Sequence, residues 1–218
     1  MIRSLDLRGK PLSKAGYQRA IPRASLDIAS AMVTIEPILQ KVKSGTESDL
    51  LQLAEEFDGV RPAAIRVPQG ALDKALSDLD PKIRAALELS ADRIRKVHSD
   101  QKREEKITKV VDGGVVTERW IPVDRVGLYV PGGRAVYPSS VLMNVIPAQI
   151  AKVSSIAVAS PPQKEFGGLP HPTILAACAL LGIYEVYAVG GAQAIALFAY
   201  GMDGLCEKCD LVTGPGNI

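Results

Sequence analysis

The second half of the chain alternates apolar strand, glycine-containing loop and helix, and this rhythm restricts the possible folds more than any other feature. From residue 124 onward, three helical segments separate four β-prone runs, at residues 125–130, 154–160, 184–191 and 209–216. The runs are apolar throughout instead of alternating with polar residues, which indicates a parallel sheet covered on both faces. We therefore expect an α/β fold, with a parallel sheet and helices on both of its faces.

The first half of the chain has the spacing of helices instead. Apolar residues recur at helical intervals over residues 24–45, where Pro37 interrupts the pattern, and again over residues 46–59. The second of these segments opens with Thr46 three residues before Asp49, which resembles a capping box. Asp80 followed by Pro81 predicts the start of another helix, which extends toward residue 104. This region is expected to be mainly helical.

A hairpin is predicted between the two halves. Two β-prone runs flank Asp112-Gly113-Gly114, a strong short-range signal for a tight turn between antiparallel strands. The sequence thus predicts three regions: a mainly helical region over 1–106, a hairpin boundary over 107–120 and an α/β domain over 121–218.

Charge and apolar content exclude several classes of partner. Lys and Arg number 26 against 24 acidic residues, and a formal charge of +2 gives no electrostatic case for nucleic acid. The amino terminus has no apolar core of a signal peptide. Residues 186–202 carry no charge, but they fall short of a membrane span of about 20 residues and contain a glycine pair. We interpret them as a buried strand followed by a buried helix, and we expect a cytoplasmic protein without a membrane partner.

The three cysteines, Cys178, Cys206 and Cys209, are too few for a disulfide framework. Cys206 and Cys209 have the C-x-x-C spacing of zinc and thiol-exchange sites. However, no second such pair exists, and the only histidines are His98 and His171. We interpret the pair as incidental thiols, with a redox protein as a competing hypothesis, and we expect both histidines to be non-catalytic.

The candidate ligand-binding residues lie in three loops that follow strands, at residues 129–140, 189–194 and 213–217. In a parallel sheet these loops share one edge. Their glycines allow the backbone to come close to a phosphate. Helices are expected to start at Ser139 or Ser140 and at Ala192, and each helix start offers free N–H groups. The polar candidates at this edge are Tyr129, Gln193 and Asn217.

Arg134 in the first loop has two interpretations: it pairs with an anionic ligand, or it is a solvated loop residue. The usual G-x-G-x-x-G dinucleotide signature is absent from the sequence. The residues alone therefore predict an α/β domain with a site for a nucleotide or a small anion.

The same loops carry a resemblance to a known family. The stretches "RVGLYVPGGRAVYPSSVLMNVIPAQIAKV", "VYAVGGAQAIALFAYG" and "VTGPGN" closely resemble histidinol dehydrogenase in order and spacing. The helical half also fits, including Phe57-Asp58-Gly59. The resemblance covers essentially the whole chain but only the amino-terminal half of the family's length.

This resemblance implies a function and a set of cofactors. The family oxidises L-histidinol through L-histidinaldehyde to L-histidine in two NAD-dependent steps, the last in histidine biosynthesis. Its members are zinc-dependent homodimers with intertwined subunits and incomplete Rossmann-like domains, so the resemblance makes 121–218 an NAD-binding domain and 1–106 part of a split domain. The family's NAD contacts match Tyr129, Gln193 and Asn217.

Other family residues have no counterpart in the sequence. The family's zinc ligands, its substrate-binding serine and its Glu-His acid/base pair follow the last of these loops. We therefore expect a truncated histidinol dehydrogenase that is inactive alone, with no catalytic residue and no metal ligand of its own. The alternative is a non-catalytic remnant or nucleotide-binding module.

Overall fold

The computed structural model describes residues 5–9, 11–21, 28–132 and 135–216. The chain forms two compact units, residues 1–34 and residues 35–217. The first unit contains helix α1 (Lys14–Ala20), which begins after Ser13. The Ser13 hydroxyl oxygen accepts a hydrogen bond from the N–H of Gly16 at 3.2 Å and so caps the helix.

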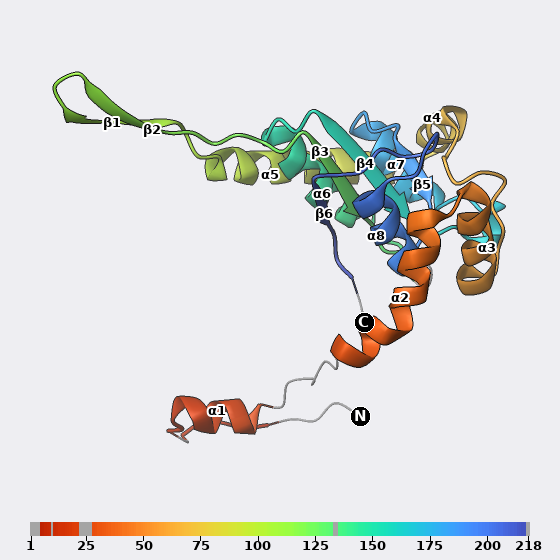
Figure 1. Cartoon of the computed structure of the whole chain (residues 1–218), viewed down its shortest axis with the longest axis horizontal. Coiled ribbons are helices and arrows are strands. Elements are labelled where there is room, and N and C mark those ends of the chain that lie inside the picture. The colour runs from red at the N-terminus through yellow and green to blue at the C-terminus, as the bar shows by residue number, and fades with distance from the viewer. Residues whose placement is uncertain (1–4, 10, 22–27, 133–134, 217–218) are drawn as a thin grey trace. The chain divides into compact units, whose positions relative to one another are not determined.

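A four-stranded parallel sheet organises the second unit (Figure 1). Its strands are β3 (Arg125–Tyr129), β4 (Ser155–Ser160), β5 (Val186–Ala188) and β6 (Leu211–Thr213), in the order β5-β4-β3-β6. Every neighbouring pair is parallel. The parallel sheet predicted from the apolar runs is therefore confirmed.

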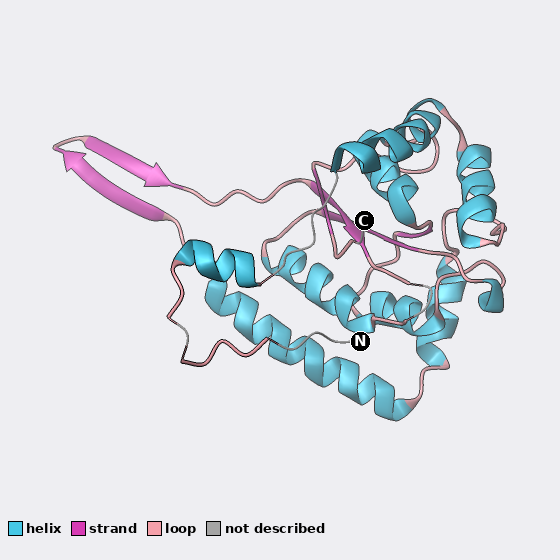
Figure 2. Cartoon of the chain, turned by 90° about the horizontal axis from the view of Figure 1, so that it is seen from below, coloured by secondary structure: helices cyan, strands magenta, loops and turns pink. Residues whose placement is uncertain are grey.

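Helices cover both faces of this sheet (Figure 2). Alternate strand residues face opposite sides, so Val158 belongs to one buried cluster while Ala157 and Ala159 belong to the other. The first cluster includes α6 (Pro138–Ile150) and α7 (Pro172–Leu180), and the second includes α8 (Gly191–Tyr200). This arrangement confirms the expected α/β architecture.

The helices that precede the sheet complete both layers. They are α2 (Ile28–Ser44), α3 (Glu47–Asp58), α4 (Gln69–Ser77) and α5 (Pro81–Gln101). Asp49 accepts from the N–H of Thr46 at 2.8 Å, and Asp80 accepts from the N–H of Lys82 at 2.8 Å, so both predicted starts are confirmed.

Two features of these helices differ from the prediction. Helix α2 continues through Pro37 instead of breaking there, because Pro37 is exposed and water can replace the one lost donor. Helix α4 was not predicted. The segment before it extends the sheet, since the N–H of Val67 donates to the carbonyl of Val186 at 2.9 Å.

The predicted hairpin is present as a separate two-stranded sheet, β1 (Lys106–Val111) and β2 (Gly114–Glu118) (Figure 2). Gly113 in the turn has φ of 78°, a conformation that favours glycine. Every residue of β1 is exposed to solvent. The hairpin is thus confirmed, while the domain boundaries at 106 and 120 stay predictions.

The uncharged stretch at 186–202 forms β5 and α8, as expected. Among the residues that the structure describes, no helix has both the length and the apolar character needed to cross a membrane.

Candidate functional site

The topology places a switch point between β3 and β6. The chain moves from β3 to β4 and then to β5 on one side, and returns with β6 to the other side of β3. The loops that leave the carboxyl ends of β3 and β6 therefore diverge from neighbouring strands. In open α/β sheets, ligands bind in the crevice that such diverging loops form.

Tyr129 joins the three predicted loops at this edge. It ends β3, and its phenol oxygen accepts a hydrogen bond from the N–H of Gly191 at 3.4 Å, which links it to the loop after β5. The loop after β6 passes against its backbone, because a Cβ at Gly214 would lie only 2.2 Å from the Tyr129 carbonyl oxygen. Burial raises the pKa of Tyr129, and the nearby Asp58 carboxylate raises it further.

The loop after β5 presents the start of α8. Gly191 has φ of 56°, and a Cβ there would lie 2.9 Å from the Gln193 side-chain oxygen. Gln193 itself is 2% exposed, so its amide is held inside the edge and not on the surface. Gly190 at this helix start is buried against Pro161 and Asp58, whereas Gly191 is exposed, so a ligand can approach the helix N-terminus from the Gly191 side.

The loop after β3 leads into α6, which begins earlier than predicted. Pro138 is the first helical residue and Tyr137 the N-cap, so neither Ser139 nor Ser140 caps the helix. Proline suits the first helical position because its fixed φ fits the helix. The N–H group that proline lacks would have no partner within the helix at this position. Arg134 lies outside the described residues.

The third polar candidate, Asn217, also lies outside the described residues. Of the three candidates, Tyr129 and Gln193 are brought together by the Gly190–Gly191 loop. The placement of Asn217 stays a prediction.

Three further polar side chains belong to this edge and were missed by the sequence analysis. Asp58 Oδ2, Ser160 Oγ and Gln163 Nε2 are buried, and none has a hydrogen-bond partner among the described residues. Each such atom costs about 1–3 kcal/mol in a folded chain. Burial raises the pKa of Asp58 to about 6.

The sequence carries only weak signals for these residues. Asp58 belongs to the tripeptide Phe57-Asp58-Gly59 that resembles the family, and Ser160 ends an apolar run before two prolines. Asp58 and Ser160 come close because α3 packs against the sheet, and no local sequence pattern predicts that packing.

The opposite edge of the sheet holds a buried ion pair. The guanidinium of Arg125, at the start of β3, donates to the Glu185 carboxylate at 2.9 Å and to the carbonyl of Glu207 at 3.2 Å. Tyr187 donates its hydroxyl to Glu185 at 2.7 Å. Arg125 is only 9% exposed, and this network forms part of the lining of a hollow of about 1390 Å³ at the amino ends of the strands.

The cysteine pair belongs to the same edge of the sheet, where Cys206 also lines the hollow. Cys206 is buried, and the Arg125 guanidinium lies 3.8 Å from its sulfur. Burial raises the pKa of Cys206 and raises that of Cys209 to about 11. Thiols with raised pKa values are poor nucleophiles, which favours the interpretation as incidental thiols over the redox hypothesis.

The histidines and acidic residues of the described ranges do not gather into a metal site. Within the described ranges, no three His, Cys, Asp or Glu side chains lie close enough together to hold a metal ion. His171 instead caps α7, because its Nδ1 accepts from the N–H of Thr173 at 3.1 Å. His98 lies on α5 and is partly exposed.

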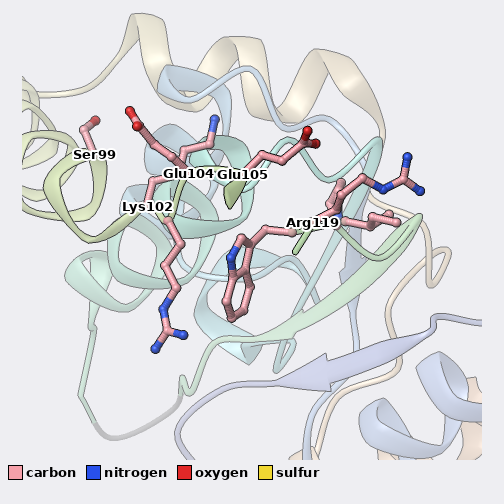
Figure 3. A pocket seen from close by; sticks show the side chains of 9 residues that line it. Ser99, Lys102, Glu104, Glu105 and Arg119 are labelled. Atoms are coloured by element: carbon pink, nitrogen blue, oxygen red, sulfur yellow. The ribbon is translucent and has the colours of Figure 1, made fainter. Parts of the chain in front are cut away.

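A groove of about 700 Å³ lies at the foot of the hairpin (Figure 3). Charged side chains of both signs line it, among them Lys102, Glu104 and Arg119, and the Arg103 guanidinium lies 4.5 Å from the Trp120 ring centre. None of the buried polar atoms that lack a partner in the described residues lies in this groove. The carboxyl edge of the sheet is therefore the better candidate for a ligand site.

Comparison with known proteins gives one consistent result. A family model described as histidinol dehydrogenase matches residues 21–218. The histidinol dehydrogenase of Thermobifida fusca is 63% identical over 218 residues, which cover 100% of this chain and 49% of that protein. That of Streptomyces avermitilis is 58% identical over 219 residues, again with 100% and 49% covered.

A solved structure agrees with these sequences. The crystal structure of histidinol dehydrogenase from Elizabethkingia anophelis superimposes with a TM-score of 0.81 at 30% identity, over 90% of this chain and 44% of that one. The chain thus spans about half the length of the curated relatives that it matches.

Proposed function

The chain belongs to the histidinol dehydrogenase family, an oxidoreductase family, and from this premise we propose that it forms the nucleotide-binding part of such an enzyme. The reaction would be the oxidation of L-histidinol through L-histidinaldehyde to L-histidine with NAD, the last step of histidine biosynthesis. The observation that carries this proposal is the meeting of Tyr129 with the loops after β5 and β6 at the switch point of the sheet.

The described residues at this edge suit a dinucleotide. The N-terminus of α8 would face the bound dinucleotide on the exposed side of Gly191, away from Asp58, where its positive dipole end favours an anion. Tyr129 would offer its ring and hydroxyl, and Gln193 an amide that donates and accepts. Asn217 would act in the same way on the neighbouring loop. NAD, when bound, supplies the hydride acceptor.

Zinc and the catalytic groups would come from another part of the protein. The described residues offer no cluster of three metal ligands, and the matched relatives are about twice as long. We therefore propose that residues 1–218 alone do not oxidise histidinol. As the family resemblance implies, we expect the complete enzyme to be a cytoplasmic homodimer.

A second candidate function is nucleotide binding without catalysis. It is favoured because three loops meet at the proposed nucleotide site, while the described residues hold no cluster of metal ligands. A chain of this kind would bind NAD and release it unchanged.

The test combines a titration with an assay. We expect the 218-residue chain to bind NAD in isothermal titration, and Tyr129→Ala to weaken binding about tenfold. Tyr200→Ala is the matched control, because Tyr200 is 42% exposed at the far end of α8.

The assay measures NADH after zinc, histidinol and NAD are added to the chain. No NADH is expected, and zinc-dependent NADH formation would contradict the proposal that this part is inactive alone. Failure of the wild-type chain to bind NAD would contradict the nucleotide site itself.

A further inference from the structure

The buried polar atoms without a partner in the described residues gather around one proline, Pro161, at the carboxyl end of β4. A Cβ at Gly132 would lie 3.2 Å from Pro161 Cδ, 3.3 Å from Ser160 Oγ and 3.5 Å from Gln163 Nε2. A Cβ at Gly190 would lie 2.8 Å from Pro161 Cγ and 3.3 Å from Asp58 Oδ1. The unpaired groups therefore share one place and are not scattered through the core.

This place is assembled from several segments of the chain. Asp58 is the last residue of α3, where Gly59 with φ of 69° ends the helix. Ser160 ends β4 and is 0% exposed, and Gln163 follows in the next loop. Buried polar groups in folded proteins are paired as a rule, so a convergence of three unpaired groups indicates a binding site.

The three groups are complementary to neighbouring hydroxyls. A carboxylate accepts hydrogen bonds with both of its oxygens, a serine hydroxyl donates and accepts, and a glutamine amide donates with its nitrogen and accepts with its oxygen. Adjacent hydroxyl groups, each a donor and an acceptor, match this set. A phosphate does not match, because the carboxylate would repel it and Ser160 and Gln163 carry no positive charge to offset this.

The position in the fold indicates which hydroxyls these are. In dinucleotide-binding folds, an acidic residue about 20 residues after the first glycine loop, at the end of the second strand, accepts from the ribose hydroxyl of adenosine. Here β3, α6 and β4 form that unit, and β4 ends in Ser160-Pro161-Pro162 with no acidic residue. Asp58 reaches the same place from α3 and supplies the missing carboxylate.

We propose that Asp58, with Ser160 and Gln163, binds the 2′- and 3′-hydroxyls of the adenosine ribose and selects NAD over NADP. This inference rests on the proposed nucleotide site. The 2′-phosphate of NADP would meet a carboxylate in a buried place. Asp58 is thus a specificity-determining residue that comes from outside the α/β unit.

The ionisation of Asp58 is consistent with this role. Burial raises its pKa, and no cation of the described residues opposes the shift. A hydroxyl that donates to the carboxylate favours the ionised form, so bound ribose would replace the solvation that burial removes.

The test compares NAD and NADP by isothermal titration of the 218-residue chain at pH 8. The wild-type chain is expected to prefer NAD at least tenfold, and Asp58→Asn to reduce this preference to less than about threefold by binding NAD more weakly and NADP more tightly. Glu56→Gln is the matched control, because Glu56 is an exposed carboxylate on the same helix and should leave the preference unchanged. Circular dichroism checks that each variant is folded.

A second measurement needs no variant. The wild-type chain should bind the analogue of NAD that lacks the adenosine 2′-hydroxyl about tenfold more weakly than NAD. Equal affinity for the two, or an unchanged preference in Asp58→Asn, would overturn this inference and leave the proposed nucleotide site intact. A wild-type chain that binds neither NAD nor NADP would overturn both.

Discussion

The ring of Phe198 on α8 lies against the backbone of Gly127 in β3, so closely that a Cβ at Gly127 would come within 2.4 Å of the ring. Phe198 is completely buried, and its ring also meets that of Tyr187 edge to face, with 6.0 Å between ring centres. Helix α8 carries the glycine start of the candidate site. The absence of a side chain at Gly127 thus sets how near this helix lies to the sheet.

Gly127→Ala should therefore destabilise the chain. The added methyl group has no space, and overpacking of a core costs about 1–3 kcal/mol in free energy of unfolding. Urea denaturation measures the change. Gly70→Ala is the control, since no atom lies within 4 Å of a Cβ there and alanine favours the helix. Equal stability of the Gly127 variant and the wild-type chain would contradict the observed packing.

Glu185→Gln should destabilise the chain through the charge it leaves behind. Arg125 would keep a guanidinium at 9% exposure without its carboxylate, which costs about 2–4 kcal/mol after allowance for the partly exposed Glu185. Glu88→Gln breaks the exposed pair with Arg84 and should cost less than about 0.5 kcal/mol. If both variants lost a similar free energy of unfolding, the buried pair would stabilise the chain no more than the exposed pair does.

The stability of the chain should depend on the ionisation of Asp58. Its pKa is raised to about 6 in the folded chain from 3.8, so folding favours the protonated form. The free energy of unfolding therefore loses this contribution as the pH rises from about 4 to 6. The loss is on the order of 2 kcal/mol and is complete above that range.

Asp58→Asn isolates this contribution. In urea denaturation the variant should gain stability relative to the wild-type chain between pH 4 and pH 6.5, with little further change up to pH 8. A difference between the two chains that is constant over the whole range would show that Asp58 ionises normally in the fold.

The cysteines should resist modification in the folded chain. Cys178 is fully buried with a pKa raised to about 12 by burial, and burial also raises the pKa values of Cys206 and Cys209. A disulfide reagent at pH 8 should react slowly with the native chain and rapidly with all three thiols in guanidinium chloride. Rapid native reaction at Cys206 and Cys209, compared with Cys178 as the internal control, would support the redox hypothesis.

The elements predicted correctly are those with a local cause. The strands are apolar runs that stop before a glycine or a proline, and α5 begins where Asp80 and Pro81 stand together. The start of α6 was misplaced by the preference of serine for N-caps, which competes with the preference of proline for the first helical position.

The candidate site was predictable only in part. Tyr129 lies at the end of a predicted strand and Gln193 at the start of a predicted helix. Their position at one edge of the sheet follows once the sheet is predicted to be parallel. Asp58 and Ser160 are about a hundred residues apart in sequence, and their convergence on Pro161 comes from tertiary packing. A burial pattern reports that a residue is inside but not which groups surround it.

The return of β6 to the side of β3 has a consequence for synthesis on the ribosome. Val126, Gly127 and Leu128 pair with residues 211–213, so that side of β3 stays unpaired while more than eighty further residues are translated. Strands β4 and β5 leave the ribosome first and can assemble on the other side of β3. Because an unpaired strand edge is a template for association with other chains, the nascent protein is expected to need chaperone protection of β3 during this interval.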